Sequence, residues 1–106
     1  MPADPVTVVD TAEFRRWFAD LRDGRARGRI LLRIRRLSLG NFGDTRSLGG
    51  GLHELRVDYG PGYRIYFVLR GDDLVLLVSG GDKSRQRNDI ERARRIAAAW
   101  EADDEI

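Results

Sequence analysis

The stretch "GPGYRIYF" (60–67) places an arginine, Arg64, between aromatic residues directly after a tight turn. Arg56 comes shortly before that turn, and Lys83 follows the apolar run "LVLLVSGG". Two arginines on one face of a hairpin can hold a phosphodiester and stabilise the charge that builds on it during transfer. Lys83 beside them is a candidate for proton transfer. Tyr66 is a candidate to stack a base or to protonate a leaving oxygen.

The chain excludes several other kinds of site. It has no cysteine and a single histidine, His53, so it offers neither a thiol nucleophile nor the usual ligands of a zinc site, and no cofactor is expected. Without a metal, the reaction that suits these residues is attack by an RNA 2′-hydroxyl on the adjacent phosphate. The alternation of the strand puts His53 on the core side with Leu55, so we do not expect it to be the base.

Lys83 is the only lysine among 19 basic residues. An excess of arginine favours binding to nucleic acid, although a GC-rich genome produces the same bias. The helical spacing of Arg33 and Arg36 gives a basic stripe that could contact a polyanion, although an arginine-rich solvated helix face is commoner. The residues predicted to contact RNA are Arg33, Arg36, Ser79, Ser84 and Arg85. On the strands, Glu54 and Asp58 share the face of the arginines and could pair with them as a surface ion lattice instead.

The chain has 106 residues, 42% hydrophobic and 34% charged, with a net charge of +2. This describes one globular domain over residues 1–106, with an acidic tail at 101–106. That tail could mask the basic face, but a frayed, solvated tail is the more ordinary expectation. No signal peptide or membrane span is recognisable, so a cytoplasmic protein without a membrane partner is expected.

The order of apolar patterns predicts an α+β fold. Residues 6–9 resemble a short edge strand, and Asp10 is expected to cap a helix that ends near Gly24. A second helix is expected from Arg25 to Leu39, so that the two form a helical hairpin. A C-terminal helix, capped by Ser84 or Asn88, should pack on the sheet.

Residues 40–51 are glycine-rich and are expected to form a loop. Three antiparallel strands should follow at 52–59, 63–70 and 74–81, joined by short turns. If Tyr59 faces Tyr63, then Arg56 opposes Tyr66, and the next hairpin sets Tyr66 against Leu77. The residues expected to face the core are Leu55, Val57, Tyr59, Tyr63, Ile65 and Phe67. On the outer strand, Val75 and Leu77 would leave apolar surface for a partner to cover.

Two longer stretches, "GGGLHELRVDYGPGYRIYF" and "LVSGGDKSRQRNDIERA", together resemble the RelE/ParE toxin superfamily, especially its HigB-like addiction module killer proteins. The similarity covers roughly residues 6–100. It implies a type II toxin of RelE-like fold that cleaves mRNA, often on the ribosome. It also implies a protein antitoxin, of helix-turn-helix type in the HigB-like arrangement.

By this resemblance, the basic cleft of the family corresponds to Arg56, Arg64 and Lys83 in this chain. Many ribonucleolytic relatives have a Tyr, His or Arg near the C-terminus that protonates the leaving group, whereas this chain ends in "AAAWEADDEI". Tyr66, Lys83 or the ribosome itself would then supply the proton. The same departure leaves open a non-enzymatic toxin that inhibits DNA gyrase or another protein. For the ribonuclease, Arg64→Ala is expected to abolish toxicity and to leave the fold intact.

Overall fold

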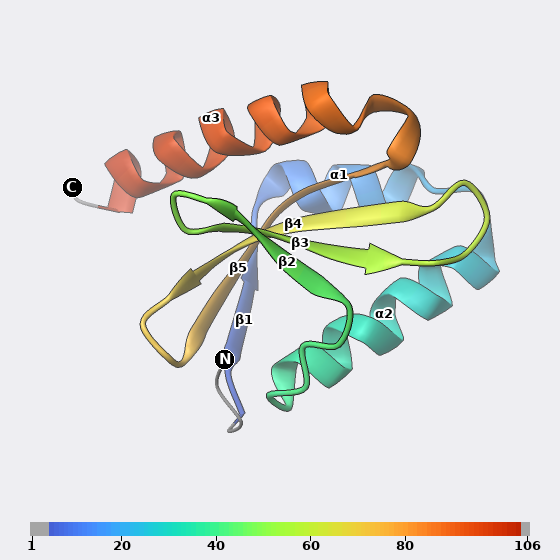
Figure 1. The fold of residues 1–106 in the computed structure, drawn as a ribbon, viewed down its shortest axis with the longest axis horizontal. Helices are drawn as coiled ribbons and strands as arrows, with labels where there is room; N and C mark the ends of the chain where they lie inside the picture. Colours follow the sequence, from blue (N-terminus) through green and yellow to red (C-terminus); the bar gives the residue numbers. More distant parts are fainter. Residues whose placement is uncertain (1–4, 105–106) are drawn as a thin grey trace.

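Five strands form one sheet between two layers of helices (Figure 1). The computed structural model describes the backbone of residues 5–104 and the side chains of residues 5–100. The strands lie in the order β1-β5-β4-β3-β2. Their bounds are Thr7–Asp10 for β1, Thr45–Gly49 for β2, Leu52–Val57 for β3, Tyr63–Arg70 for β4 and Leu74–Asp82 for β5. The α+β class is confirmed, and so is the short edge strand near residues 6–9.

The sheet is mixed rather than purely antiparallel, because β1 runs parallel to β5. The three predicted strands form the antiparallel part, and β2 adds a fourth antiparallel strand within the segment expected to be a loop. Gly49, Gly50 and Gly51 all have positive φ and reverse the chain, so the polar residues before them pair with β3. This strand was missed because it is short and lacks a clear apolar alternation.

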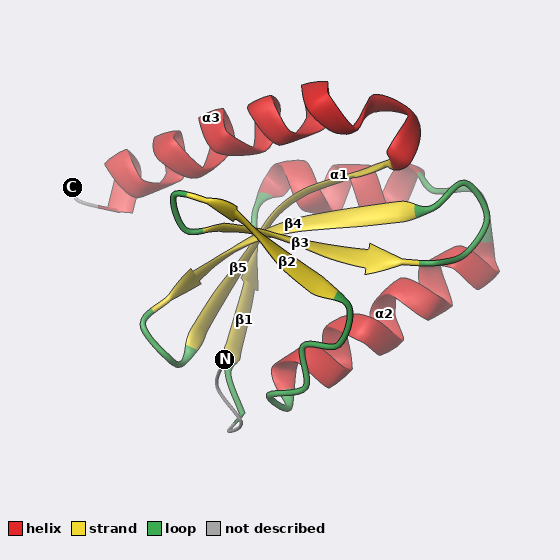
Figure 2. Cartoon of the chain, in the orientation of Figure 1, coloured by secondary structure: helices red, strands yellow, loops and turns green. Residues whose placement is uncertain are grey.

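Helices α1 (Ala12–Asp20) and α2 (Gly24–Ser38) cover one face of the sheet, and α3 (Gln86–Asp104) covers the other (Figure 2). The predicted helical hairpin and C-terminal helix are confirmed, but several ends differ. Thr11 rather than Asp10 caps α1, since its hydroxyl accepts a hydrogen bond from the Phe14 amide. Asp10 ends β1 and pairs with Arg15 instead.

The start of the last helix also differs from the prediction. A 3-10 turn, η1 (Lys83–Arg85), precedes α3, and the Asp82 carboxylate caps it by accepting the Ser84 amide. Neither Ser84 nor Asn88 is therefore the first cap. The backbone of the acidic tail continues the helix to Asp104, while its side chains, and residues 105–106 altogether, lie outside the described part.

Strand β5 lies inside the sheet, between β1 and β4. Val75 is 0% exposed and Leu77 2%, so the prediction that they leave an open apolar surface is wrong. Strand β5 was expected to be an outer strand because no local sequence pattern indicates that β1, from the start of the chain, pairs with it. Of the predicted core residues, Leu55, Val57, Ile65 and Phe67 are buried, and the two tyrosines are half-buried beside them.

The strand registers are shifted from those predicted. Val57 pairs with Tyr63, so Arg56 lies directly opposite Arg64 instead of Tyr66. On the other side of β4, Tyr66 pairs with Ser79 rather than Leu77, and an irregularity follows it. The turn between β3 and β4 is longer than the one assumed, and turn length sets hairpin register.

Gly80 in β5 allows α1 to approach the sheet closely. A Cβ at this position would lie 2.3 Å from the Trp17 ring, far inside van der Waals contact. Gly28 in α2 has the opposite surroundings, with nothing within 4 Å of an added Cβ.

We expect Gly80→Ala to lower the free energy of unfolding by about 1–3 kcal/mol, because Trp17 must shift from the sheet. Gly28→Ala is the matched control, and it should raise stability by about 0.5–1 kcal/mol through a better helix propensity. Urea denaturation of both variants measures the difference. Equal stability of Gly80→Ala and the wild type would contradict this view of the packing.

Candidate functional site

A pocket of about 230 Å³ lies at the end of the β3–β4 hairpin. It brings together the three basic residues singled out in the sequence, Arg56 from β3, Arg64 from β4 and Lys83 from η1. The other lining residues are Asp44, Val57, Asp58, Gly62 and Tyr63. We call this the basic pocket.

The hairpin turn places Lys83 in the basic pocket. Gly60 and Gly62 have φ values of 56° and 83°, which residues with side chains rarely adopt. The Lys83 amide donates to the Gly62 carbonyl at 3.0 Å. A Cβ on Gly62 would lie 3.3 Å from Lys83 Cδ, so the absence of a side chain leaves room for the lysine stem. Among the described residues, the Lys83 side chain has no ion-pair partner.

Arg56 forms an exposed ion pair at the edge of the basic pocket. Its Nε and Nη2 donate to Asp44 Oδ1 at 3.1 and 2.6 Å. The Arg56 side chain is 39% exposed and that of Asp44 52%. Asp44 was not singled out in the sequence. It lies just before β2 and is held there because the Arg56 amide donates to its carbonyl.

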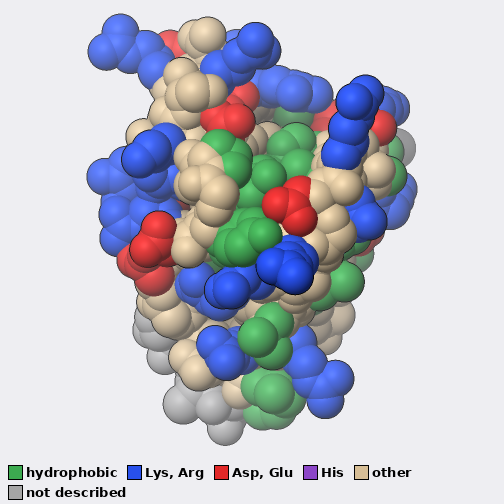
Figure 3. Space-filling model, turned by 90° about the vertical axis from the view of Figure 1, so that its right-hand side faces the viewer, with side chains coloured by type: hydrophobic (Ala, Val, Ile, Leu, Met, Phe, Trp, Pro, Cys, Tyr) green, Lys and Arg blue, Asp and Glu red, His purple; other side chains and the backbone are tan. Residues whose placement is uncertain are grey.

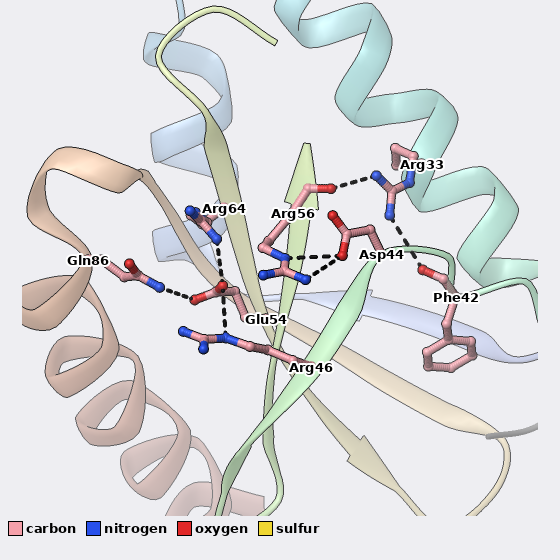
Figure 4. A network of polar contacts seen from close by, with 8 residues as sticks. All are labelled: Arg33, Phe42, Asp44, Arg46, Glu54, Arg56, Arg64 and Gln86. Carbon is pink, nitrogen blue, oxygen red and sulfur yellow. Dashed lines mark hydrogen bonds and ion pairs between the residues drawn. The ribbon is translucent and has the colours of Figure 1, made fainter. Parts of the chain in front are cut away.

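Arg64 forms a much more enclosed pair with Glu54. Arg64 Nη1 donates to Glu54 Oε1 at 2.8 Å, and the two side chains are 16% and 0% exposed. Gln86 at the start of α3 donates to Glu54 Oε2 at 2.8 Å, and Arg46 Nε lies 3.4 Å from Oε1 (Figure 4). The pairing of Glu54 with an arginine was foreseen as part of a surface ion lattice, but its carboxylate is fully buried. Asp58, the other member of that lattice, has no ion pair among the described residues.

Tyr66 and Ser79 do not lie on an open surface. They are 0% and 4% exposed, and Tyr66 packs in the core beneath α3. Burial, with the nearby carboxylates of Glu54 and Asp89, raises the pKa of Tyr66. A C-terminal helix packed on the sheet was predicted, but local patterns did not indicate that α3 covers the face that carries Tyr66. Tyr66 is thus not placed to stack on a base.

The other predicted RNA contacts lie around the basic pocket rather than in it. Arg33 and Arg36 line a neighbouring pocket that shares Val57 and Asp58 with it. Arg33 also joins α2 to the sheet, since its Nη1 donates to the Arg56 carbonyl at 2.6 Å. Ser84 and Arg85 line a groove of about 430 Å³ that shares Tyr63 with the basic pocket. Figure 3 shows Lys and Arg side chains around an apolar area on the face that carries the hairpin turn.

His53 lies on the face that α1 and α2 cover, as predicted. Its ring stacks on Phe67 with centroids 5.2 Å apart, and its buried Nδ1 has no partner among the described residues. It does not line the basic pocket. Burial lowers the pKa of His53 below its ordinary value.

Within the described part of the chain, no group of three His, Cys, Asp or Glu residues is arranged to hold a metal ion. The helices found there are also too short or too polar to cross a membrane.

The sequence matches a known family over most of its length. Residues 16–100 match the phage-derived Gp49-like proteins (DUF891). The chain belongs to the Gp49-like family. An uncharacterized protein of Haemophilus influenzae is 44% identical over 92 residues, which cover 87% of this chain and 93% of that protein. The Gp49-like family is a RelE-like toxin family of toxin–antitoxin systems, so the superfamily resemblance is confirmed at this level.

The environment of His53 predicts a pH dependence of stability. Its pKa is lowered in the folded protein from an ordinary value of 6.5, so the unfolded chain binds the proton more readily. Stability should therefore fall as the pH drops below about 6.5. His53→Phe, which can keep the stacking on Phe67, should lose less melting temperature than the wild type between pH 7.5 and 5.5. Parallel pH profiles for the two proteins would contradict the assignment.

Proposed function

We propose that this Gp49-like protein is a HigB-like toxin that cleaves mRNA without a metal and so inhibits translation, most effectively on the ribosome. The observation that carries the proposal is the convergence of Arg56, Arg64 and Lys83 on one pocket. Arg56 and Arg64 are each paired with a carboxylate, whereas Lys83 has no ion-pair partner among the described residues, so a phosphodiester would supply the anion that this cation lacks. The family supports the class of toxin.

The reaction that fits the basic pocket is transfer of the phosphoryl group to the neighbouring 2′-hydroxyl. The 2′-oxygen forms a bond to phosphorus, the bond to the 5′-oxygen breaks, and a cyclic phosphate remains. The arginines hold the two non-bridging oxygens, whose negative charge grows in the transition state. Asp44 and Asp58 are the carboxylates available to accept the 2′-proton, and Lys83 is the candidate to deliver a proton to the leaving oxygen.

A single strand of RNA would extend from the basic pocket across its basic surroundings. Arg33 and Arg36 lie on one side, and Ser84 and Arg85 on the other. These residues are proposed to hold the backbone of the flanking nucleotides, a contribution that weakens with salt.

Membership in a family of toxin–antitoxin proteins implies a protein antitoxin as the partner. We propose one of helix-turn-helix type that lays carboxylates over the basic pocket. Since Val75 and Leu77 are buried, its apolar contacts have to lie elsewhere. The large exposed apolar side chains of the described part are Val9, Leu31, Leu32 and Leu39, three of which belong to α2 or its C-cap.

The catalytic role is tested with Lys83→Ala and Arg56→Ala, whose side chains are exposed enough to be lost without opening the core. Each should slow RNA cleavage by about 10²-fold, as expected for loss of a charge-stabilising donor at Arg56 and of a proton donor at Lys83, with little change in melting temperature. Arg64→Lys should also fail to support cleavage, because a point charge does not replace a planar fork. Arg64→Ala is less informative than the sequence suggested, since it leaves the buried Glu54 carboxylate without its closest cation.

The measurement is the mapping of transcript ends after induction of the wild type and each variant, beside the melting temperature of each purified protein. New ends within translated messages in the wild type alone support the ribonuclease. Intact messages together with accumulated DNA breaks would overturn it in favour of a gyrase inhibitor. Full cleavage by a folded Lys83→Ala and a folded Arg56→Ala would place the chemistry outside the basic pocket.

A further inference from the structure

The two arginines of the basic pocket are held in different ways. Arg56 pairs with Asp44 where both side chains are open to solvent, at 39% and 52% exposure. Exposed ion pairs contribute little to stability and exchange readily with other ions. An incoming phosphate can therefore take the place of Asp44 on Arg56.

The partner of Arg64 cannot be displaced in this way. Glu54 is 0% exposed, and Arg64, Arg46 and Gln86 enclose its carboxylate, so an anion in the basic pocket does not reach it. A buried carboxylate is costly unless its oxygens are satisfied by hydrogen bonds. Here both oxygens are satisfied, Oε1 by Arg64 and Oε2 by Gln86. We therefore expect the Arg64–Glu54 ion pair to stay formed when an anion binds in the basic pocket.

The geometry leaves Arg64 oriented toward the basic pocket. Nη1 is committed to Glu54, and Nε is buried without a partner among the described residues. The Arg64 side chain is nevertheless 16% exposed and lines the basic pocket, where a phosphate would bind. Figure 4 shows Glu54 between Arg64, Arg46 and Gln86, which come from three other segments of the chain.

We propose that Glu54 is a positioning residue that fixes the Arg64 guanidinium for the transition state, at the expense of substrate affinity. This inference rests on the proposed cleavage of RNA. A negative charge beside the basic pocket opposes the binding of a polyanion. A donor that is already oriented needs no reorganisation when charge develops on the phosphate. Glu54 therefore accelerates the chemical step while it weakens binding of the RNA.

Glu54→Gln separates these two effects, because the amide keeps the shape of the side chain and loses its charge. Cleavage of an mRNA programmed on ribosomes is followed under single-turnover conditions. The rate at saturating toxin should fall about tenfold or more, while the toxin concentration at half-saturation should stay the same or decrease. An effect on the rate alone is not expected from a residue that only stabilises the fold.

Asp10→Asn is the matched control. It removes the same charge from an exposed ion pair with Arg15, at the end of β1 and outside the lining of the basic pocket. It should leave the saturating rate unchanged. If Glu54→Gln matches this control in rate, or lowers affinity and melting temperature without changing the saturating rate, Glu54 is a structural residue and the inference is wrong.

A second measurement does not depend on cleavage. Slow rotation of the Arg64 guanidinium in the wild type should give separate nitrogen NMR signals for its two terminal nitrogens, and these should merge in Glu54→Gln. Merged signals in the wild type would overturn the positioning role even if RNA is cleaved. Separate Arg64 signals in a protein that cleaves no RNA would instead refute the proposed function and leave Glu54 as the residue that orients Arg64.

Discussion

The burial of the Glu54 carboxylate is the constraint on which this end of the molecule depends. A charge that has lost its water has to find donors within the protein, and no single element supplies them all. Arg64 comes from the next strand, Arg46 from the edge strand and Gln86 from the first turn of the last helix. One buried charge therefore ties β2, β3, β4 and α3 together at the rim of the basic pocket.

The packing of helices on both faces depends on a second local feature, the pair of glycines near the end of β5. Trp17 of α1 lies against Gly80 on one face, and an added Cβ on Gly81 would lie 2.1 Å from the Asp89 carboxylate of α3 on the other. Side chains at these positions would hold both helices away from the sheet. Asp82 and Lys83 follow directly, so the same close approach brings η1 to the β3–β4 hairpin.

The buried Glu54 carboxylate and the close packing at Gly80 and Gly81 together explain how three basic residues can lie close together in a chain of this size. Arg56 and Arg64 are direct neighbours across the hairpin, an arrangement that normally destabilises a sheet. Each is balanced by its own carboxylate, Asp44 in solvent and Glu54 in the interior. The repulsion between the two arginines is thereby tolerated.

Much of the fold could be predicted from local patterns. Amphipathic spacing identified the three helices, and alternation identified β3, β4 and β5 together with the face that packs on α1 and α2. Those predictions succeeded because the apolar periodicity of a helix or a strand depends only on residues that are close together in the sequence. The same alternation placed Arg56 and Arg64 on one face. The predictions failed where the pattern was weak, as in the polar strand Thr45–Gly49.

The sequence by itself therefore determined the three basic residues of the basic pocket, the strands that carry Arg56 and Arg64, and the superfamily. Tertiary structure decided which of those residues are open to solvent. Strand pairing made β5 an interior strand, and the approach of α3 buried Tyr66 while it brought Gln86 to Glu54. The burial of a side chain and its ion-pair partner depend on residues that are distant in the chain, as in the pair of Asp44 and Arg56. Local periodicity carries no information about such contacts.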